Sequence, residues 1–237
     1  MSSTPAATPG ATEPPTRRSR YHHGDLANTL ATEATALARQ GGPTAVVLRE
    51  AARRAGVSPT AAYRHFASHE DLLVAVRARA QEQLAGAMEQ ALRSLPVLPD
   101  PRADILRRTR VIARAYVRFA VDEPGLFRTA FSNSDPARTR ARAAAAVSPP
   151  GSAGGTAGGT DIYEYRSFHI LGELLDELVA TGVVAPERRE GAEFPAWSTM
   201  HGLATLIIDG PLAVLTPEQQ ELAVRVTLDT VLAGLAR

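Results

Sequence analysis

The chain has 237 residues, 44% of them hydrophobic, so it is long enough to bury one small and one larger helical core. It has no cysteine, which excludes disulfide bonds and thiolate metal sites, and its formal net charge of +1 does not by itself indicate a nucleic-acid partner. There is no apolar run of about 18 residues and no basic start followed by an apolar core, so we expect neither a membrane span nor a signal peptide, and hence a cytoplasmic protein.

Residues 1–20 are rich in Pro, Thr, Ala and Ser, and they end in a basic cluster of Arg17, Arg18 and Arg20. Such a composition cannot bury a core, so we expect a disordered basic arm. A first helix is predicted from about Asp25 to the break at Gly41-Gly42-Pro43. Its apolar residues repeat on one face: Leu26, Leu30, Ala34 and Leu37.

A second, short amphipathic helix is predicted from about Leu48 to Ala55. Gly56 ends it, because a glycine just past a helix can take the left-handed conformation, and Val57 can pack back on the last turn. Ser58-Pro59 then begins a third helix, predicted to end at about Phe66. Serine accepts the free N–H groups of a first turn, and proline suits the first helical position.

Ser68, followed three residues later by Asp71, resembles a capping box that begins a longer helix. Three helices in this order, with a tight turn between the second and the third, are typical of a helix-turn-helix DNA-binding module. The alternative interpretation is a plain helical hairpin within an all-α protein.

Residues 25–76 resemble the N-terminal domain of the TetR family of bacterial transcriptional regulators. The matching residues are Leu48-Arg49-Glu50, Ala55-Gly56-Val57-Ser58 and Tyr63-Arg64-His65-Phe66, in the family's order and spacing. The chain departs from the family at Ala51, Ala62 and His69, where a β-branched residue, a leucine and a lysine are usual. The family's lysine reaches a phosphate, which a neutral histidine does less well.

The resemblance implies that this segment binds double-stranded operator DNA. Thr60 and Ala61 are expected to face the major groove, where a hydroxyl and a methyl group can read base edges. The resemblance favours contacts from Tyr63 and His65 to the DNA backbone, and the remaining candidates for DNA contact are Arg49, Ser58, Arg64 and His69. For Arg53, Arg54, Arg64 and Arg77, a solvated helix face is as good an interpretation as a phosphate contact.

The arginines at 17, 18 and 20 are expected to order on DNA, in a narrow minor groove or along phosphates, as the arms of other helix-turn-helix proteins do. The alternative is a solvated tail with no role.

The helix from Ser68 is predicted to run to about Leu92, before a proline-rich break at residues 96–101. Another amphipathic helix is predicted from Ala103 to Val121, followed by a short segment rich in aromatic residues. Residues 143–160 consist mostly of Ala, Ser, Pro and Gly, which predicts a mobile loop. The last three helices are predicted at about Ile162–Thr181, Arg189–Asp209 and Pro217–Leu235.

The apolar residues of the last helix cover more than one stripe, so that one side can pack inward while the other meets a partner. We expect the last two helices of two chains to form a four-helix interface, because two DNA half-sites normally need two readers. The alternative is that both helices are buried within a single chain.

Trp197, His201 and Gly202, together with residues 122–127, resemble the C-terminal domain of a TetR subfamily named for its Trp-His-Gly signature. The resemblance implies a domain that dimerises and receives a small effector. Eight side chains are candidates for an apolar effector cavity with polar handles: Tyr116, Phe119, Phe127, Phe131, Tyr165, His169, Trp197 and His201. Each of them, taken singly, is also a good core residue.

No nucleophile elbow, phosphate loop or paired-histidine zinc motif occurs, so we expect no enzyme activity, no cofactor and no metal. The sequence thus predicts an all-α homodimer with an arm at 1–20, a DNA-binding domain at 21–67 and an effector-binding and dimerisation domain at 68–237. The resemblance implies a repressor, released from a palindromic operator by a small apolar molecule. The alternative is a helical protein-interaction or architectural module that lacks regulated DNA binding.

Overall fold

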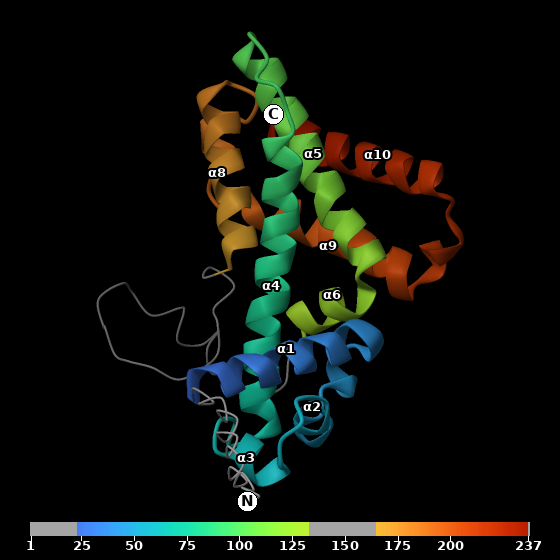
Figure 1. The fold of residues 1–237 in the computed structure, drawn as a ribbon. Coiled ribbons are helices and arrows are strands. Elements are labelled where there is room, and N and C mark those ends of the chain that lie inside the picture. The colour runs from blue at the N-terminus through green and yellow to red at the C-terminus, as the bar shows by residue number, and fades with distance from the viewer. Residues whose placement is uncertain (1–22, 133–164, 237) are drawn as a thin grey trace, which may run out of the picture.

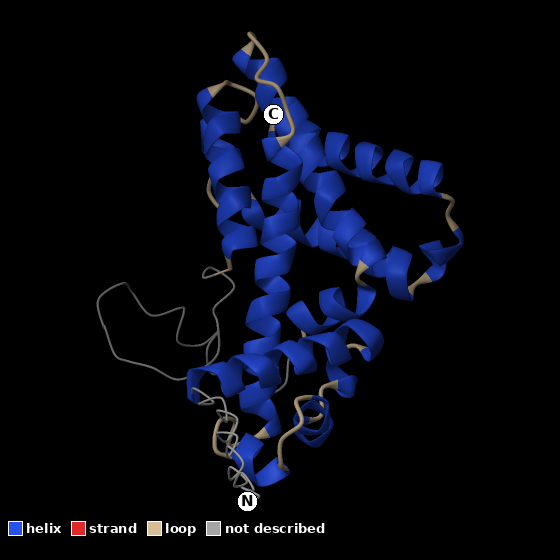
Figure 2. Ribbon diagram, viewed as in Figure 1, coloured by secondary structure: helices blue, strands red, loops and turns tan. Residues whose placement is uncertain are grey.

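A computed structural model describes residues 23–132 and 165–236, and every regular element in these ranges is a helix (Figure 2). The all-α prediction is therefore confirmed. The arm at 1–20 and the low-complexity segment at 143–160 lie outside the described residues. None of the described helices is long and apolar enough to cross a membrane.

The N-terminal module contains α1 (His23–Gly41), the 3-10 turn η1 (Pro43–Ala45), α2 (Leu48–Arg54) and α3 (Pro59–Tyr63). These elements gather at one end of the molecule, around the first turns of α4 (Figure 1). Their shared core consists of fully buried small and aliphatic side chains: Leu30, Ala34, Val46, Ala51, Ala52, Ala62, Leu72 and Val76. Ala51 and Ala62, which depart from the family's usual residues, are thus core positions.

The turn between α2 and α3 forms as its residues predict. Gly56 has a φ of 69°, and the N–H of Val57 donates to the carbonyl of Ala52 at 3.0 Å, which closes α2. Ser58 caps α3 by accepting the N–H of Ala61 at 3.2 Å, and Pro59 takes the first helical position.

Helix α3 ends at Tyr63, earlier than the predicted end at about Phe66. The N–H groups of Arg64 and His65 donate to carbonyls three residues back instead of four, so the chain tightens into a turn. This turn brings the Phe66 ring into the core, where it is only 9% exposed.

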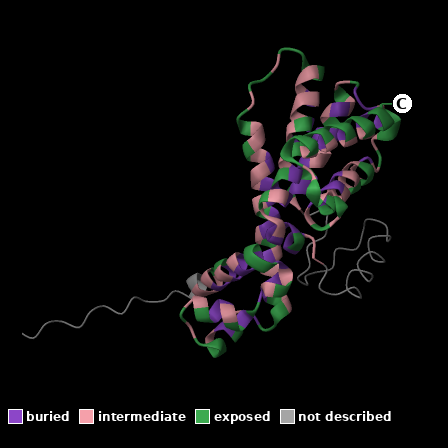
Figure 3. Ribbon diagram, turned by 90° about the vertical axis from the view of Figure 1, so that its right-hand side faces the viewer, coloured by how far each residue is buried: buried purple, intermediate pink, exposed green. Residues whose placement is uncertain are grey.

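Helix α4 (His69–Arg93) lies at the centre of the molecule and runs from the N-terminal module into the larger helical part (Figure 1). Its start confirms the predicted capping box, because Ser68 and Asp71 exchange side-chain-to-backbone hydrogen bonds of 3.1 and 3.0 Å. Buried residues run along its whole length, and Figure 3 shows them continuing from the N-terminal module into the larger helical part. Because α4 packs on both parts, the boundary at 67/68 remains a prediction.

The larger part contains α5 (Pro101–Asp122), α6 (Pro124–Ala130), α8 (Arg166–Ala180), α9 (Glu193–Asp209) and α10 (Pro217–Leu235), with short 3-10 turns η3 (Pro186–Arg188) and η4 (Pro211–Val214). The predicted bounds of α10 are confirmed. Helix α9 begins at Glu193 and not at about Arg189, because Gly191 has a φ of 71°, which interrupts the helix. The predicted start of α8 lies in the range that the structure does not describe.

Candidate nucleic-acid interface and effector cavity

Helix α3 presents polar side chains at the N-terminal end of the molecule, away from α8, α9 and α10 (Figure 1). Thr60 and Arg64 are exposed, Tyr63 is 46% exposed, and Ala61 is half-buried. A tyrosine so far exposed on a five-residue helix gains little from packing within its own chain. The exposed end of α3 therefore offers a threonine, a tyrosine and an arginine to a partner surface.

The arginines of this module divide into two groups. Arg53 and Arg54 both donate to the carboxylate of Glu50, at 2.7 and 3.1 Å, and these hydrogen bonds lower the pKa of Glu50 to about 2. Arg49 and Arg64 are exposed and have no hydrogen bond or ion pair with any described residue. Arg49 and Arg64, both candidates for DNA contact, thus have no acidic partner among the described residues.

His69 differs from the family's lysine in its contacts as well as its charge. Its Nε2 lies 2.7 Å from the carbonyl oxygen of Val46, which can only accept, so this nitrogen donates. His69 therefore ties the start of α4 to the chain before α2.

Two further candidates for DNA contact occupy structural positions. The Ser58 hydroxyl caps α3 and keeps its proton for donation, while His65 is half-buried and engaged in a contact within the chain. The arginines at 17, 18 and 20 lie outside the described residues.

A cavity lies among α4, α5, α8, α9 and α10, far from α3. The space open to the centre of a water molecule is about 70 Å³, enough for several waters. Its walls consist mainly of aliphatic and aromatic side chains, including Met88, Ile112, Leu171, Leu174, Leu178, Met200, Leu228 and Leu232. None of the described residues that line it is charged.

The structure brings four of the eight predicted cavity residues to its wall: Tyr116, Phe131, Tyr165 and Trp197. Phe127 and His201 lie directly behind them, stacked with ring centroids 5.2 Å apart. Phe119 borders an open groove between α4 and α5 instead, and His169 is exposed on α8. The last two side chains are therefore not gathered with the others.

A chain of hydrogen bonds joins Trp197, Tyr116 and His201 at the cavity wall. The indole N–H of Trp197 donates to the Tyr116 hydroxyl at 3.2 Å, and the same hydroxyl lies 2.9 Å from Nδ1 of His201. Burial raises the pKa of Tyr116 and lowers that of His201, which keeps both groups neutral. Since indole can only donate, His201 Nδ1 is the acceptor that the described residues offer to the buried tyrosine proton, in the tautomer of His201 that carries its own proton on Nε2.

Two family models match this chain. Residues 30–76 match the model of bacterial regulatory proteins of the tetR family, and residues 109–231, more than half of the chain, match that of the tetracyclin repressor-like C-terminal domain. The chain belongs to the TetR family. It is therefore a regulator with a helix-turn-helix DNA-binding domain at its N-terminus and a larger helical C-terminal domain.

Solved structures of similar fold include a Rhodococcus sp. RHA1 protein of unknown function, 26% identical, with a TM-score of 0.66 over 93% of this chain and 100% of that one. A TetR-family transcriptional regulator from Pectobacterium atrosepticum is 20% identical, with a TM-score of 0.61 over 92% and 97% of the two chains. A transcriptional regulator from Pseudomonas aeruginosa PAO1 is 18% identical, with a TM-score of 0.60 over 94% and 97%. No curated protein matches the chain.

The matched C-terminal model does not distinguish the Trp-His-Gly subfamily, which remains a prediction. In this TetR-family chain, two residues of the signature lie together at the cavity. Trp197 lines the cavity, and the ring centroids of Trp197 and His201 are 5.2 Å apart.

Sequence reasoning missed most of the aliphatic cavity wall in this TetR-family regulator. The wall includes residues of three different helices: Ile112, Leu174 and Leu228. In its own helix, each of them is part of an apolar pattern with ordinary core spacing. Periodicity shows which face of a helix is buried, but not whether the buried face meets another helix or an empty space. Only the packing of the helices separates the two cases.

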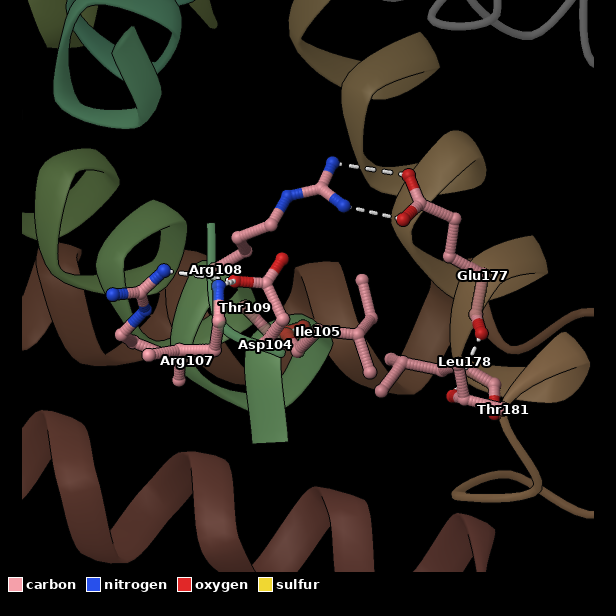
Figure 4. A network of polar contacts seen from close by, with 9 residues as sticks. Asp104, Ile105, Arg107, Arg108, Thr109, Glu177, Leu178 and Thr181 are labelled. Atoms are coloured by element: carbon pink, nitrogen blue, oxygen red, sulfur yellow. Dashed lines mark hydrogen bonds and ion pairs between the residues drawn. The ribbon is translucent and has the colours of Figure 1, made fainter. Parts of the chain in front are cut away.

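The charged residues near the cavity do not line it, and they form ion pairs with one another. Arg108 of α5 donates twice to Glu177 of α8, and Asp104 accepts from Arg107 at 2.8 Å (Figure 4). The backbone N–H of Leu98 donates to Asp104, and this hydrogen bond is the main cause of the lowered pKa of Asp104. The hydrogen bond from Arg107 lowers the pKa further. The Arg108–Glu177 pair joins α5 to α8, and the Asp104–Arg107 pair lies within α5; the described residues that face the cavity are uncharged.

Proposed function

We propose that this TetR-family regulator is a homodimeric repressor that binds a palindromic operator and is released by a small apolar molecule in the cavity of its C-terminal part. The observation that carries the proposal is the pairing of an exposed polar helix α3 in a helix-turn-helix module with an uncharged cavity at the other end of α4. In this proposal the boundary between the two domains lies at 67/68, and operator binding implies a cytoplasmic location.

The reading helix is α3. Thr60 and Ala61 would meet base edges, and Tyr63 and Arg64 would meet the phosphate backbone. Their exposure supports this assignment, as does the absence of an acidic partner for Arg64 among the described residues. Arg17, Arg18 and Arg20 of the arm would add backbone or minor-groove contacts.

The dimer would form through α9 and α10. These two helices pack on each other and expose large apolar side chains: Phe194 is 57% exposed, Leu206 44%, Leu222 49% and Val226 54%. Apolar side chains at this exposure gain most when a second copy covers them, and the same surface on two copies gives a closed two-fold dimer. The inward stripe of α10, which includes Leu228 and Leu232, is buried within the chain.

Helix α6 connects the cavity to the DNA-binding module. The buried amide of Gln81 accepts from Ser167, a cavity residue, at 3.1 Å and donates to the carbonyl of Ala130 at 3.0 Å, at the end of α6. Arg128 of α6 also pairs with Asp209 of α9 at 2.9 Å. A ligand that moves α8 or α9 would therefore move α6.

The other end of α6 lies against α1. Gly125 packs so closely that a Cβ there would lie 2.3 Å from the carbonyl oxygen of Ala38. A shift of α6 would thus displace α1 and the two reading helices of a dimer. If the ligand favours a conformer with wrongly spaced reading helices, operator affinity falls by the same factor by which the operator weakens ligand binding.

The test is binding of the purified protein to the DNA that flanks its own gene, against unrelated DNA, at two salt concentrations. The proposal predicts tight binding to a specific site that weakens steeply with salt, as phosphate contacts require. Equal binding to both DNAs, or none, followed by failure to select any site from random DNA, would favour the helical interaction module instead.

A further inference from the structure

Four hydrogen-bonding groups that line the cavity, those of Tyr116, Trp197, Ser167 and Thr109, direct their protons into the protein. With His201 in the Nε2–H tautomer, the Tyr116 hydroxyl donates to His201 Nδ1; the Trp197 N–H donates to Tyr116, and the Ser167 hydroxyl donates to Gln81. The hydroxyl of Thr109 donates to the carbonyl of Ile105 at 2.8 Å. Four donors of the wall are thus engaged before any ligand arrives.

The same groups keep acceptor capacity. A hydroxyl oxygen can accept twice, and Tyr116 accepts only from Trp197 among the described residues. The oxygens of Thr109 and Ser167 accept from no described residue. All three residues are buried, with 6 to 9% exposure, so these acceptors can be satisfied only by a molecule inside the cavity, either water or a ligand that displaces it.

The wall also lacks a counter-charge. The nearby Arg108 already pairs with Glu177 outside the cavity, and the described lining residues include no cation and no carboxylate. Burial of an unpaired ion costs far more than burial of a neutral group. A carboxylate ligand would meet acceptor oxygens, which repel it.

We infer that the cavity selects an uncharged, mainly hydrocarbon ligand that carries a hydroxyl or N–H donor, and that the donor binds the Tyr116 oxygen. This inference rests on the proposed effector role of the cavity and specifies the ligand class. A neutral ligand without a donor fits the apolar wall but leaves the buried acceptors unsatisfied. An anion of the same length is excluded.

Three probes of matched size separate these classes: 1-octanol, heptyl methyl ether and octanoate at pH 8. Trp197 is the only tryptophan of the chain and lines the cavity, so its fluorescence reports binding to the full-length protein without DNA. Octanol should bind about fivefold to tenfold more tightly than the ether, as expected for one hydrogen bond to a buried acceptor, and octanoate should give no saturable change.

Two variants locate the acceptor. Tyr116→Phe removes it, so octanol and the ether should bind within about twofold of each other. Thr109→Val removes a second acceptor and should lower octanol affinity by a smaller factor. Thr230→Val is the matched control, because Thr230 makes the same bond to its own helix but is exposed on α10, so the octanol preference should remain.

Octanoate binding as tightly as octanol would overturn the ligand class, as would an ether that binds as well as the alcohol, or octanol that does not bind at all. Each of these results leaves operator binding untouched, since that is measured on DNA without probes. Failure of the ligand class is thus distinguishable from failure of the repressor proposal.

Discussion

Gly125 of α6 and Ala38 of α1 are in backbone-to-backbone contact, at a point where a Cβ on residue 125 would lie 2.3 Å from the Ala38 carbonyl oxygen. No side chain mediates this contact, so a movement of α6 reaches α1 directly. The ion pair of Arg39 with Glu123, at 2.8 Å, lies beside the contact and adds little, because both groups are partly exposed.

We predict that Gly125→Ala lowers the free energy of unfolding by about 1–3 kcal/mol, because the added methyl must push α6 away from α1. The same substitution should change operator affinity. Urea unfolding and DNA titration measure the two effects. Gly86→Ala is the control, since a Cβ there would meet no atom within 4 Å apart from its chain neighbours and the backbone of its own helix, and alanine favours a helix. If both variants behave alike, the α1–α6 contact does not couple the two parts.

Gln81→Leu should lower the free energy of unfolding by about 1–3 kcal/mol, because it leaves the Ala130 carbonyl and the Ser167 hydroxyl buried without their partner. It should also weaken the effect of a cavity ligand on operator binding. Gln90→Leu is the control: Gln90 is an exposed residue of the same helix, and its side chain accepts from the exposed Arg93. This variant should keep both the free energy of unfolding and the ligand response. A fully retained ligand response in the Gln81 variant would refute the route through α6.

Acid should destabilise the protein through His201. Burial lowers its pKa below the ordinary 6.5 in the folded state, so as pH falls below about 6.5 the unfolded chain takes up the proton first. Stability is therefore complete above that pH and is lost as the pH falls toward the lowered folded value. His201→Gln keeps an acceptor for Tyr116 but cannot titrate. Urea unfolding at pH 7.5 and 5.5 should show a smaller loss for the variant, and an equal loss would contradict this assignment.

Thr60 and Tyr63 should divide the work of DNA recognition. Tyr63→Ala should weaken binding to specific and unrelated DNA alike, because a backbone contact carries no sequence information. Thr60→Ala should change the preferred bases at one position, by about 1–3 kcal/mol. Titrations against the operator, its single-base variants and unrelated DNA measure both effects. Identical behaviour of the two variants would refute the division.

The Glu50 carboxylate pairs with the guanidinium groups of Arg53 and Arg54 at 2.7 and 3.1 Å. Glu50→Gln should therefore release both arginines from these ion pairs. Free arginines bind phosphates, so affinity for unrelated DNA should rise and its salt dependence should steepen, by about one unit of log–log slope for each new contact. Glu33→Gln makes the same charge change on α1 and serves as the control. Equal slopes for both variants would indicate that Arg53 and Arg54 face away from DNA.

The sequence was sufficient where structure depends on neighbouring residues. Gly56, Ser58 and the Ser68–Asp71 capping box each act within three or four positions, and each forms as predicted. The end of α3 was placed too late, because burial of Phe66 is decided by the core and not by the local pattern. The bond from His69 to Val46 spans 23 residues and left no signal in either segment.

The cavity was predicted only in part for a similar reason. Tyr116 and Trp197 were found because aromatic residues with polar atoms are conspicuous, and the structure brings both to the wall. Phe119 and His169 share that chemistry but lie on other faces of α5 and α8, which depend on how those helices pack. Composition identifies candidates for a cavity, and only tertiary packing selects among them.

The most direct test of the proposed repressor is selection of binding sites from random double-stranded DNA by the purified full-length protein. A dimeric repressor should enrich one palindromic sequence, with two half-sites about one helical turn apart, roughly 34–36 Å, and Tyr63→Ala should lose that enrichment. Recovery of unenriched sequences, or of a single half-site without symmetry, would contradict the proposed dimeric operator-binding repressor.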